Sequence, residues 1–147
     1  MPVTPYLTAA DLKTHIYAEN SDEIVRSDET IITECIKAGI SEAKSYLGRF
    51  DLVKVFGNDT TSPTVDNPNL KEKVKALVIW KLVGLANPNI KMELARTWYE
   101  DAIRWLERVA SNKLDPKLPM PIDDSTTDYE EDKTIQWDSE PKRKNHY

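Results

Sequence analysis

The hydrophobic residues of this chain recur mostly at intervals of three and four positions, which is the period of an amphipathic α-helix. The clearest run predicts a helix over residues 28–47. Its apolar positions share one face and are Ile32, Ile36, Ile40, Ala43 and Leu47. Ser27 or Asp28 is expected to cap the start of this helix and Gly48 its end. Gly39 lies near the apolar face, where a missing side chain would let another backbone approach.

The same period predicts a central helix over residues 68–86. Asn67 and Pro68 supply the capping side chain and the proline that are typical of a helix start. After Ala76 this segment is apolar nearly all round, with Lys81 as its one charge. Because a helix without a polar face is normally buried, we expect this one to contact every other element of the fold.

The last predicted helix covers residues 88–112 and begins with a second asparagine and proline pair, Asn87 and Pro88. At about 100° per residue, its apolar side chains form two adjoining stripes. The first stripe consists of Leu94, Trp98, Ala102, Trp105 and Val109. The second consists of Ala95, Tyr99, Ile103, Leu106 and Ala110.

These two stripes cover more of the helix than an ordinary surface helix buries. One interpretation is that a small core wraps deeply around this helix. The other is that one stripe packs inward while the other meets a partner, where aromatic side chains are common. We expect Trp98, Tyr99 and Trp105 to be divided between the core and a subunit contact.

A shorter helix is predicted near the N-terminus, over residues 8–17. Thr8 and Asp11 occupy the two side-chain positions of a capping box, in which each residue satisfies a backbone group of the other. Leu7 and Leu12 are placed to pack against each other as a hydrophobic staple across the helix start.

The remaining segments complete the predicted fold. Residues 50–56 fit neither the helical nor the strand period cleanly, so a short helix and a short strand both stay open. Residues 57–67 form a polar loop rich in turn formers. Beyond Pro116 the helical period stops. The sequence therefore predicts an all-α fold, a small bundle of about four helices in residues 1–116, followed by an extended acidic tail in residues 117–147.

Charge sets the tail apart from the helical part of the chain. The net charge is −5, and the segment from Asp115 onward holds 9 acidic and 5 basic residues. Such a composition predicts disorder in isolation. Ile135 and Trp137 alternate with polar residues in "TIQWDS" and are the predicted anchor, which would add a strand to the sheet edge of a partner. We expect the tail to dock on a neighbouring subunit or on another protein.

Candidate catalytic residues are scarce. The two histidines, His15 and His146, lie at opposite ends of the chain, and Cys35 sits among isoleucines at helical spacing, as a buried small hydrophobe does. Four glycines leave no phosphate-binding loop, and the acids of the tail lack the glycine and the spacing of a calcium loop. We expect no enzyme activity, no cofactor and no metal site.

Composition also narrows the classes of partner. The acidic balance is unlike that of a typical duplex-binding domain. Residues 76–86, the only long apolar stretch, are far fewer than the roughly 20 residues that span a bilayer, and no secretion signal is visible. We expect a soluble, non-exported chain with no membrane partner. The alternative to a structural role is a helical nucleic-acid-binding regulator, with Lys142, Arg143 and Lys144 as its basic contact.

Four segments occur in a characteristic order: "YLTAADLK", "SEAKSYLGRFDL", "NPNLKEKVKAL" and "RTWYEDAIRWLERVASNKLDP". This order resembles the head-tail connector proteins of tailed bacteriophages, in the Mu-like branch of that adaptor family. The family's tyrosine-leucine-glycine-arginine-aromatic element is similar to residues 46–50, and its aromatic, acidic, alanine-rich last helix to residues 99–114. The resemblance covers about residues 6–116 and excludes the loop at residues 57–67.

The resemblance implies a structural virion protein without enzymatic activity. Proteins of this family form a ring at the capsid-tail junction, commonly of twelve copies, through which DNA passes without sequence-specific binding. Their partners are the portal protein and tail-side proteins, and they assemble in the cytoplasm of the host bacterium. Their terminal extensions often reach onto the portal or a neighbouring subunit. A helical part with little net charge suits such a channel, because clustered lysines and arginines would hold DNA phosphates.

Overall fold

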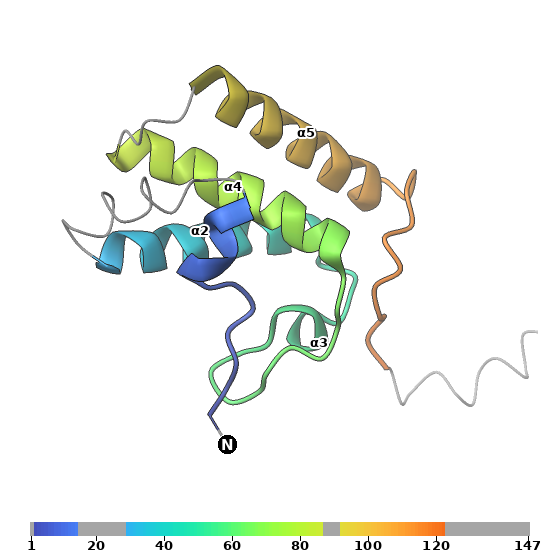
Figure 1. The fold of residues 1–147 in the computed structure, drawn as a ribbon. Helices are drawn as coiled ribbons and strands as arrows, with labels where there is room; N and C mark the ends of the chain where they lie inside the picture. The colour runs from blue at the N-terminus through green and yellow to red at the C-terminus, as the bar shows by residue number, and fades with distance from the viewer. Residues whose placement is uncertain (1, 15–28, 87–91, 123–147) are drawn as a thin grey trace, which may run out of the picture.

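The structure is a computed structural model that describes residues 2–14, 29–86 and 92–122. Within these ranges the chain forms one 3-10 helix and four α-helices, and no strand. They are η1 (Ala9–Thr14), α2 (Glu29–Tyr46), α3 (Leu52–Phe56), α4 (Pro68–Ala86) and α5 (Met92–Ala110). The predicted all-α class is therefore confirmed. In Figure 1, α4 lies between α5 and α2, and α3 sits in the connection between α2 and α4.

Helix α4 is the centre of the molecule and packs against α2, α5 and η1. Its buried side chains point in several directions, and they include Leu70, Val74, Leu77, Val78, Ile79 and Leu82. The predicted cap is confirmed, because the side-chain Oδ1 of Asn67 accepts a hydrogen bond from the Leu70 N–H at 3.1 Å. An apolar surface on all sides, as the sequence pattern predicts, is what lets one helix hold three neighbours.

The packing of α2 on α4 depends on Gly39, as predicted. A methyl group placed on Gly39 would lie 2.5 Å from Cγ2 and 3.3 Å from the backbone nitrogen of Val78. Any larger residue would therefore push the two helices apart. Cys35 is 2% exposed in the same interface, which confirms its prediction as a buried small hydrophobe.

The predicted cap at Gly48 is wrong. Gly48 does not adopt a left-handed backbone conformation, which in the described chain occurs at Gly57, Asn112 and Lys117. Helix α2 ends at Tyr46 instead, in two tight turns closed by Leu47 N–H to Lys44 O and Phe50 N–H to Leu47 O. Because these i to i+3 hydrogen bonds satisfy groups at the helix end, no left-handed residue is needed there.

The described part of the N-terminal element is a 3-10 helix over Ala9–Thr14. The rest of the helix predicted over residues 8–17 falls in residues 15–28, which lie outside the described structure. Half of the capping box forms: the carboxylate of Asp11 accepts from the N–H and the hydroxyl of Thr8, at 2.8 and 3.0 Å. The staple residues Leu7 and Leu12 are both buried.

Helix α5 ends two residues earlier than predicted, at Ala110. Asn112 takes a left-handed conformation with φ 62°, and the N–H groups of Asn112 and Lys113 return to the carbonyls of Val109 and Arg108. This pair of bonds is a Schellman motif, with asparagine at the position that glycine usually holds. The start predicted at Asn87 and Pro88 lies outside the described residues.

The folded part of the chain continues past the predicted domain boundary at Pro116. Leu118 is only 7% exposed and belongs to the core, and the carbonyl of Pro119 accepts from the Asp51 N–H at 2.9 Å. The side-chain amide of Asn67 donates to the carbonyl of Pro116 at 2.8 Å. Residues 114–119 are thus held against the N-terminal end of α4 and the start of α3. We call residues 114–122 the exit segment.

Candidate functional site

The buried face of α5 combines both predicted stripes. The side chains fully buried against α4 are Ala95, Ala102, Leu106 and Val109, two from each stripe. Of the two interpretations, the one that places one whole stripe inside and the other outside is therefore wrong. The division of Trp98, Tyr99 and Trp105 between the core and a subunit contact stays a prediction. Helix α5 packs on α4 with the boundary between the two stripes at the centre of the contact. The outer edge of each stripe is therefore only half-covered.

One of these edges is an apolar surface that α4 does not cover fully. Leu94 is 44% exposed there, while Trp98 and Trp105 pack partly against the core and remain partly exposed. At about 100° per residue the three side chains fall within about 40° of each other on α5. We call Leu94, Trp98 and Trp105 the α5 shoulder.

The opposite edge of α5 carries Tyr99, which bridges to α2. Its hydroxyl donates to Oε1 of Glu42 at 2.8 Å, and the Nζ of Lys81 on α4 lies 2.8 Å from Oε2 of the same carboxylate. The hydrogen bond to Glu42 and burial raise the pKa of Tyr99 to about 12, so this phenol is a donor and not a base at neutral pH. These three residues tie the three long helices together through one carboxylate.

An aromatic stack adjoins this bridge. The rings of Trp80 and Tyr99 lie with centroids 5.6 Å apart at an interplanar angle of 26°. The guanidinium of Arg96 lies 5.9 Å from the Trp80 ring, in the arrangement of a cation-π contact. Tyr99, which the sequence assigned to a core or subunit contact, is thus part of a mixed polar and aromatic cluster.

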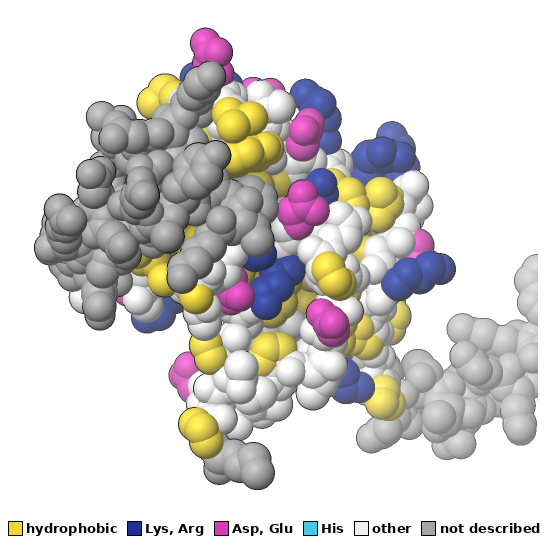
Figure 2. All heavy atoms as spheres, in the orientation of Figure 1, with side chains coloured by type: hydrophobic (Ala, Val, Ile, Leu, Met, Phe, Trp, Pro, Cys, Tyr) yellow, Lys and Arg dark blue, Asp and Glu magenta, His cyan; other side chains and the backbone are white. Residues whose placement is uncertain are grey.

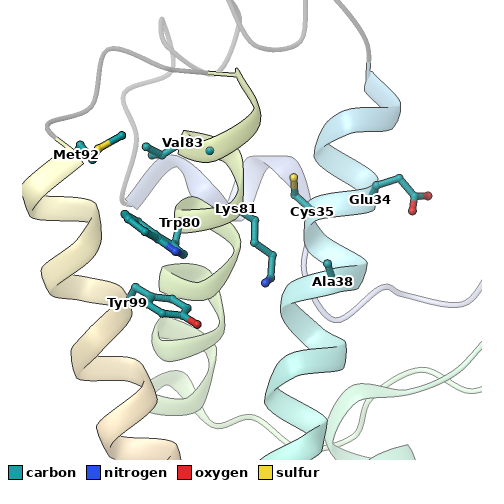
Figure 3. Close-up of a pocket in the computed structure, with 9 residues that line it drawn as sticks. Glu34, Cys35, Ala38, Trp80, Lys81, Val83, Met92 and Tyr99 are labelled. Atoms are coloured by element: carbon teal, nitrogen blue, oxygen red, sulfur yellow. The ribbon is translucent and has the colours of Figure 1, made fainter.

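Beyond the bridge, α2 and α5 separate and leave a groove over α4 (Figure 3). The groove has a volume of about 690 Å³ and is open to solvent. Its lining comes from α2 through Glu34, Cys35 and Ala38, from α4 through Trp80, Lys81, Val83 and Gly84, and from α5 through Met92 and Tyr99. Met92 is 52% exposed at its rim, and within the described ranges no atom lies within 4 Å of a methyl group added to Gly84.

The groove has little of the chemistry of an active site. Burial raises the pKa of the Cys35 thiol, which works against the thiolate that a nucleophilic cysteine needs. Lys81 and Glu34 are each ion-paired, with Glu42 and Lys37. Among the described residues no group of histidine, cysteine, aspartate and glutamate side chains is arranged to hold a metal ion. The arrangement suits the binding of an apolar side chain more than a reaction.

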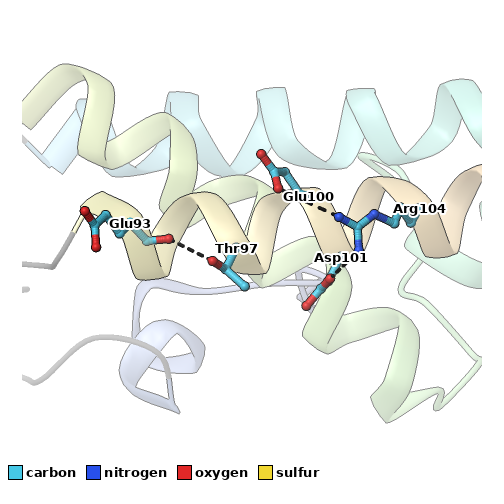
Figure 4. Close-up of polar contacts among 5 residues, drawn as sticks. All are labelled: Glu93, Thr97, Glu100, Asp101 and Arg104. Atoms are coloured by element: carbon cyan, nitrogen blue, oxygen red, sulfur yellow. Dashed lines mark hydrogen bonds and ion pairs between the residues drawn. The ribbon is translucent and has the colours of Figure 1, made fainter.

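The outward face of α5 is polar and internally paired (Figure 4). Arg104 lies between Asp101 at 3.3 Å and Glu100 at 3.9 Å, and the hydroxyl of Thr97 donates to the backbone carbonyl of Glu93 at 2.9 Å. Exposed ion pairs of this kind contribute about 0–1 kcal/mol each, so this face keeps α5 soluble more than it stabilises it.

The other predicted site residues cannot be placed. Ile135 and Trp137, the predicted anchor, and the basic residues Lys142, Arg143 and Lys144 lie outside the described residues, as do the acids of the tail. No helix in the described part of the chain is long and apolar enough to cross a membrane. Comparisons with protein-family models, curated proteins and solved structures found no match.

Sequence reasoning missed three residues of the cluster around Tyr99, namely Trp80, Arg96 and Glu42. Lys81 was the available signal, because the one charged residue in the apolar stretch over residues 76–86 needs a nearby carboxylate when it is half-buried. The i to i+3 and i+4 periodicity shows which residues share a helix face, but it does not show which helix will supply the partner.

Proposed function

We propose that this chain is a structural subunit of a bacteriophage head-tail connector, which forms a ring between the portal and the tail through which DNA passes. The observation that carries the proposal is the α5 shoulder, in which Leu94 is 44% exposed beside two partly exposed tryptophans. Aromatic and aliphatic side chains that a monomer leaves uncovered are typical of surfaces that meet another protein.

In a ring each copy contacts its two neighbours through two different surfaces. The contact is heterologous, which means that a patch on one copy binds a different patch on the next copy. The α5 shoulder is one candidate for such a patch. The order of the four sequence segments that resemble the connector family adds support from outside the structure. In this proposal the shoulder meets a neighbouring copy, and the portal and the tail-side proteins contact the ends of the ring.

The charge distribution favours the structural role over the nucleic-acid-binding regulator. Figure 2 shows lysine, arginine and acidic side chains interspersed over the described part of one face. On α5 the outward Arg104 is surrounded by two carboxylates, so this helix does not present the basic face that a recognition helix needs. Scattered, paired charges would let DNA slide past without holding its phosphates.

Native mass spectrometry of the full chain, alone and mixed with its candidate portal, tests the proposal. We expect a ring of defined stoichiometry in the presence of the portal, and weaker assembly for a chain that ends at Ile122. The truncation is placed there because Leu118 and Pro119 belong to the fold. A chain that stays monomeric with the portal but binds duplex DNA in a salt-dependent way would replace the connector with the regulator.

A further inference from the structure

Two residues other than glycine adopt a left-handed backbone conformation in the described chain, and both line the same pocket. They are Asn112, with φ 62°, and Lys117, with φ 60°. The pocket lies between the C-terminal end of α5, the turns that follow α2 and the exit segment, and its volume against the described residues is about 430 Å³. We call it the exit pocket.

The fold explains the backbone conformation at these two positions but not their side chains. The N–H of Asn112 returns to the carbonyl of Val109 to close α5, and the turn at Lys117 leads to the buried Leu118. Glycine adopts a left-handed conformation with the least strain, whereas lysine rarely does. Strained residues of this kind cluster at binding sites, where the side chain has a use that offsets the loss of stability. Two such residues in one pocket therefore indicate a binding site.

Arg49, a third polar residue of the lining, is held in place from two sides. Its Nη2 donates to the carbonyl of Val109 at 2.9 Å, and its guanidinium carbon lies 4.6 Å from the centroid of the Phe50 ring. The guanidinium carries further N–H donors in a planar fork that matches the two oxygens of a carboxylate. Because the side chain is already fixed, it loses little conformational entropy when these donors bind an anion. Arg49 is therefore a preorganised receptor for an oxyanion.

The charge of the exit pocket is positive. Among the described residues Asp115 is the one acid that lines it, and Lys117 neutralises this acid: the Lys117 N–H donates to Oδ1 at 2.9 Å, and its Nζ lies 2.9 Å from Oδ2. Hydrogen bonds from Lys117, together with the charge of Arg49, lower the pKa of Asp115, so its carboxylate is ionised at neutral pH. Two cations and one carboxylate leave a net positive charge, which favours an anionic ligand.

The remaining walls of the exit pocket are apolar. Phe50 and Leu118 belong to the core, Leu114 is half-buried, and Met120 is 55% exposed at the rim. An inorganic anion would leave these walls in contact with water, whereas an acidic side chain next to an apolar one would cover them. We propose that the exit pocket binds an acidic and apolar segment of another protein. One carboxylate of that segment binds Arg49, and a neighbouring apolar side chain packs on Leu118 and Met120.

An NMR titration of the isotope-labelled full chain tests the inference. The probe is the peptide acetyl-Leu-Asp-Phe-amide, and its control is the neutral analogue acetyl-Leu-Asn-Phe-amide, which has the same shape. With the acidic peptide we expect saturable shifts of the amide signals of residues 49–50 and 112–118. The neutral analogue should bind about tenfold more weakly, because it lacks the charge-assisted hydrogen bonds to Arg49.

Two glycine substitutions separate binding from folding. Asn112→Gly and Lys117→Gly remove the side chains from the exit pocket and relieve the strain of the left-handed backbone. We expect each to leave the urea midpoint unchanged or to raise it, while the acidic peptide binds about three- to tenfold more weakly. Arg108→Gln is the matched control and should bind as the wild type does. Arg108 is exposed in the last turn of α5 but does not line the pocket, so this variant changes the net charge alone.

The inference fails if the neutral analogue binds equally well, or if both glycine variants bind the acidic peptide as tightly as the wild type. Equal weakening by Arg108→Gln would show that net charge, and not the pocket, attracts the peptide. Short duplex DNA that displaces the peptide from the same residues in a salt-dependent way would assign the pocket to phosphates, and so favour the nucleic-acid-binding regulator. The titration needs neither the portal nor the ring, so an absence of peptide binding leaves the proposed connector function unaffected.

Discussion

Two glycines in neighbouring helices show how the same residue type can serve opposite purposes. Gly39 lies where α2 crosses α4, and a methyl group there would collide with Val78. Gly84 lies in α4 and lines the groove, and in the part of the chain that the structure describes no atom lies within 4 Å of a methyl group placed on it. The first glycine sets the distance between the two helices, whereas the second makes no close contact with the described residues and lowers the stability of its helix.

Alanine substitutions should therefore change stability in opposite directions. We expect Gly39→Ala to lower the free energy of unfolding by about 1 kcal/mol, because overpacking of about 1–3 kcal/mol exceeds the gain in helix propensity. Gly84→Ala should raise it by up to about 1 kcal/mol, since only the propensity changes. Urea denaturation followed by circular dichroism measures both. Equal stabilisation by the two substitutions would show that α2 and α4 are farther apart than the structure places them.

At the scale of elements, three parts of the chain meet at one point, namely the start of α4, the start of α3 and the exit segment. Asn67 caps the helix through its Oδ1 and holds the exit segment through its Nδ2, which donates to the carbonyl of Pro116. One side chain thus fixes both the start of the central helix and the path of the chain after α5. Its two functions use different atoms and can be separated by substitution.

Two replacements of Asn67 should give graded losses. Asn67→Asp keeps an acceptor for the Leu70 N–H, favoured by the helix dipole, but loses the donor to Pro116, so we expect a loss of about 1 kcal/mol in unfolding free energy. Asn67→Ala loses both bonds and should cost about 2 kcal/mol. Thermal and urea denaturation compare them at neutral pH. Should the two variants prove equally stable, the bond to Pro116 does not contribute to holding the exit segment.

The elements that sequence patterns predicted best are those whose signals are local. The start of α4 followed from Asn67 and Pro68, and its burial followed from the apolar run after Ala76. The cap at Gly48 was wrong because tight turns can close a helix end without a left-handed residue. The left-handed residue after α5 is Asn112, which has a weaker signal than glycine at that position.

Tertiary contacts set the limit of what could be predicted for the candidate site. Periodicity identified the apolar residues of α5 except Met92, yet which of them are buried depends on the angle at which α4 crosses the helix. The bridge from Tyr99 to Glu42 spans 57 residues and the bond from Arg49 to the Val109 carbonyl spans 60. No repeating pattern connects positions that far apart, so the groove between α2 and α5 emerges only from the folded chain.

On the scale of the whole molecule, exposed apolar residues lie on different helices. Substitutions on each helix can therefore show which surface forms the contact between copies in the proposed ring. Leu94 on the α5 shoulder and Val53 on α3 are both 44% exposed. A charge at either position meets water in the monomer, so each substitution should change the stability of the fold by no more than about 0.5 kcal/mol. Any difference between the two variants in assembly therefore reports on the contact and not on folding.

We expect Leu94→Glu to abolish portal-dependent ring formation, because a carboxylate buried in an apolar interface without a partner is strongly unfavourable. Val53→Glu should assemble as the wild type does. Native mass spectrometry gives the stoichiometry, and circular dichroism confirms that both variants stay folded. If Leu94→Glu assembles normally while Val53→Glu fails, the contact between copies lies on the α3 side of the bundle, and the two tryptophans of the α5 shoulder serve the core alone.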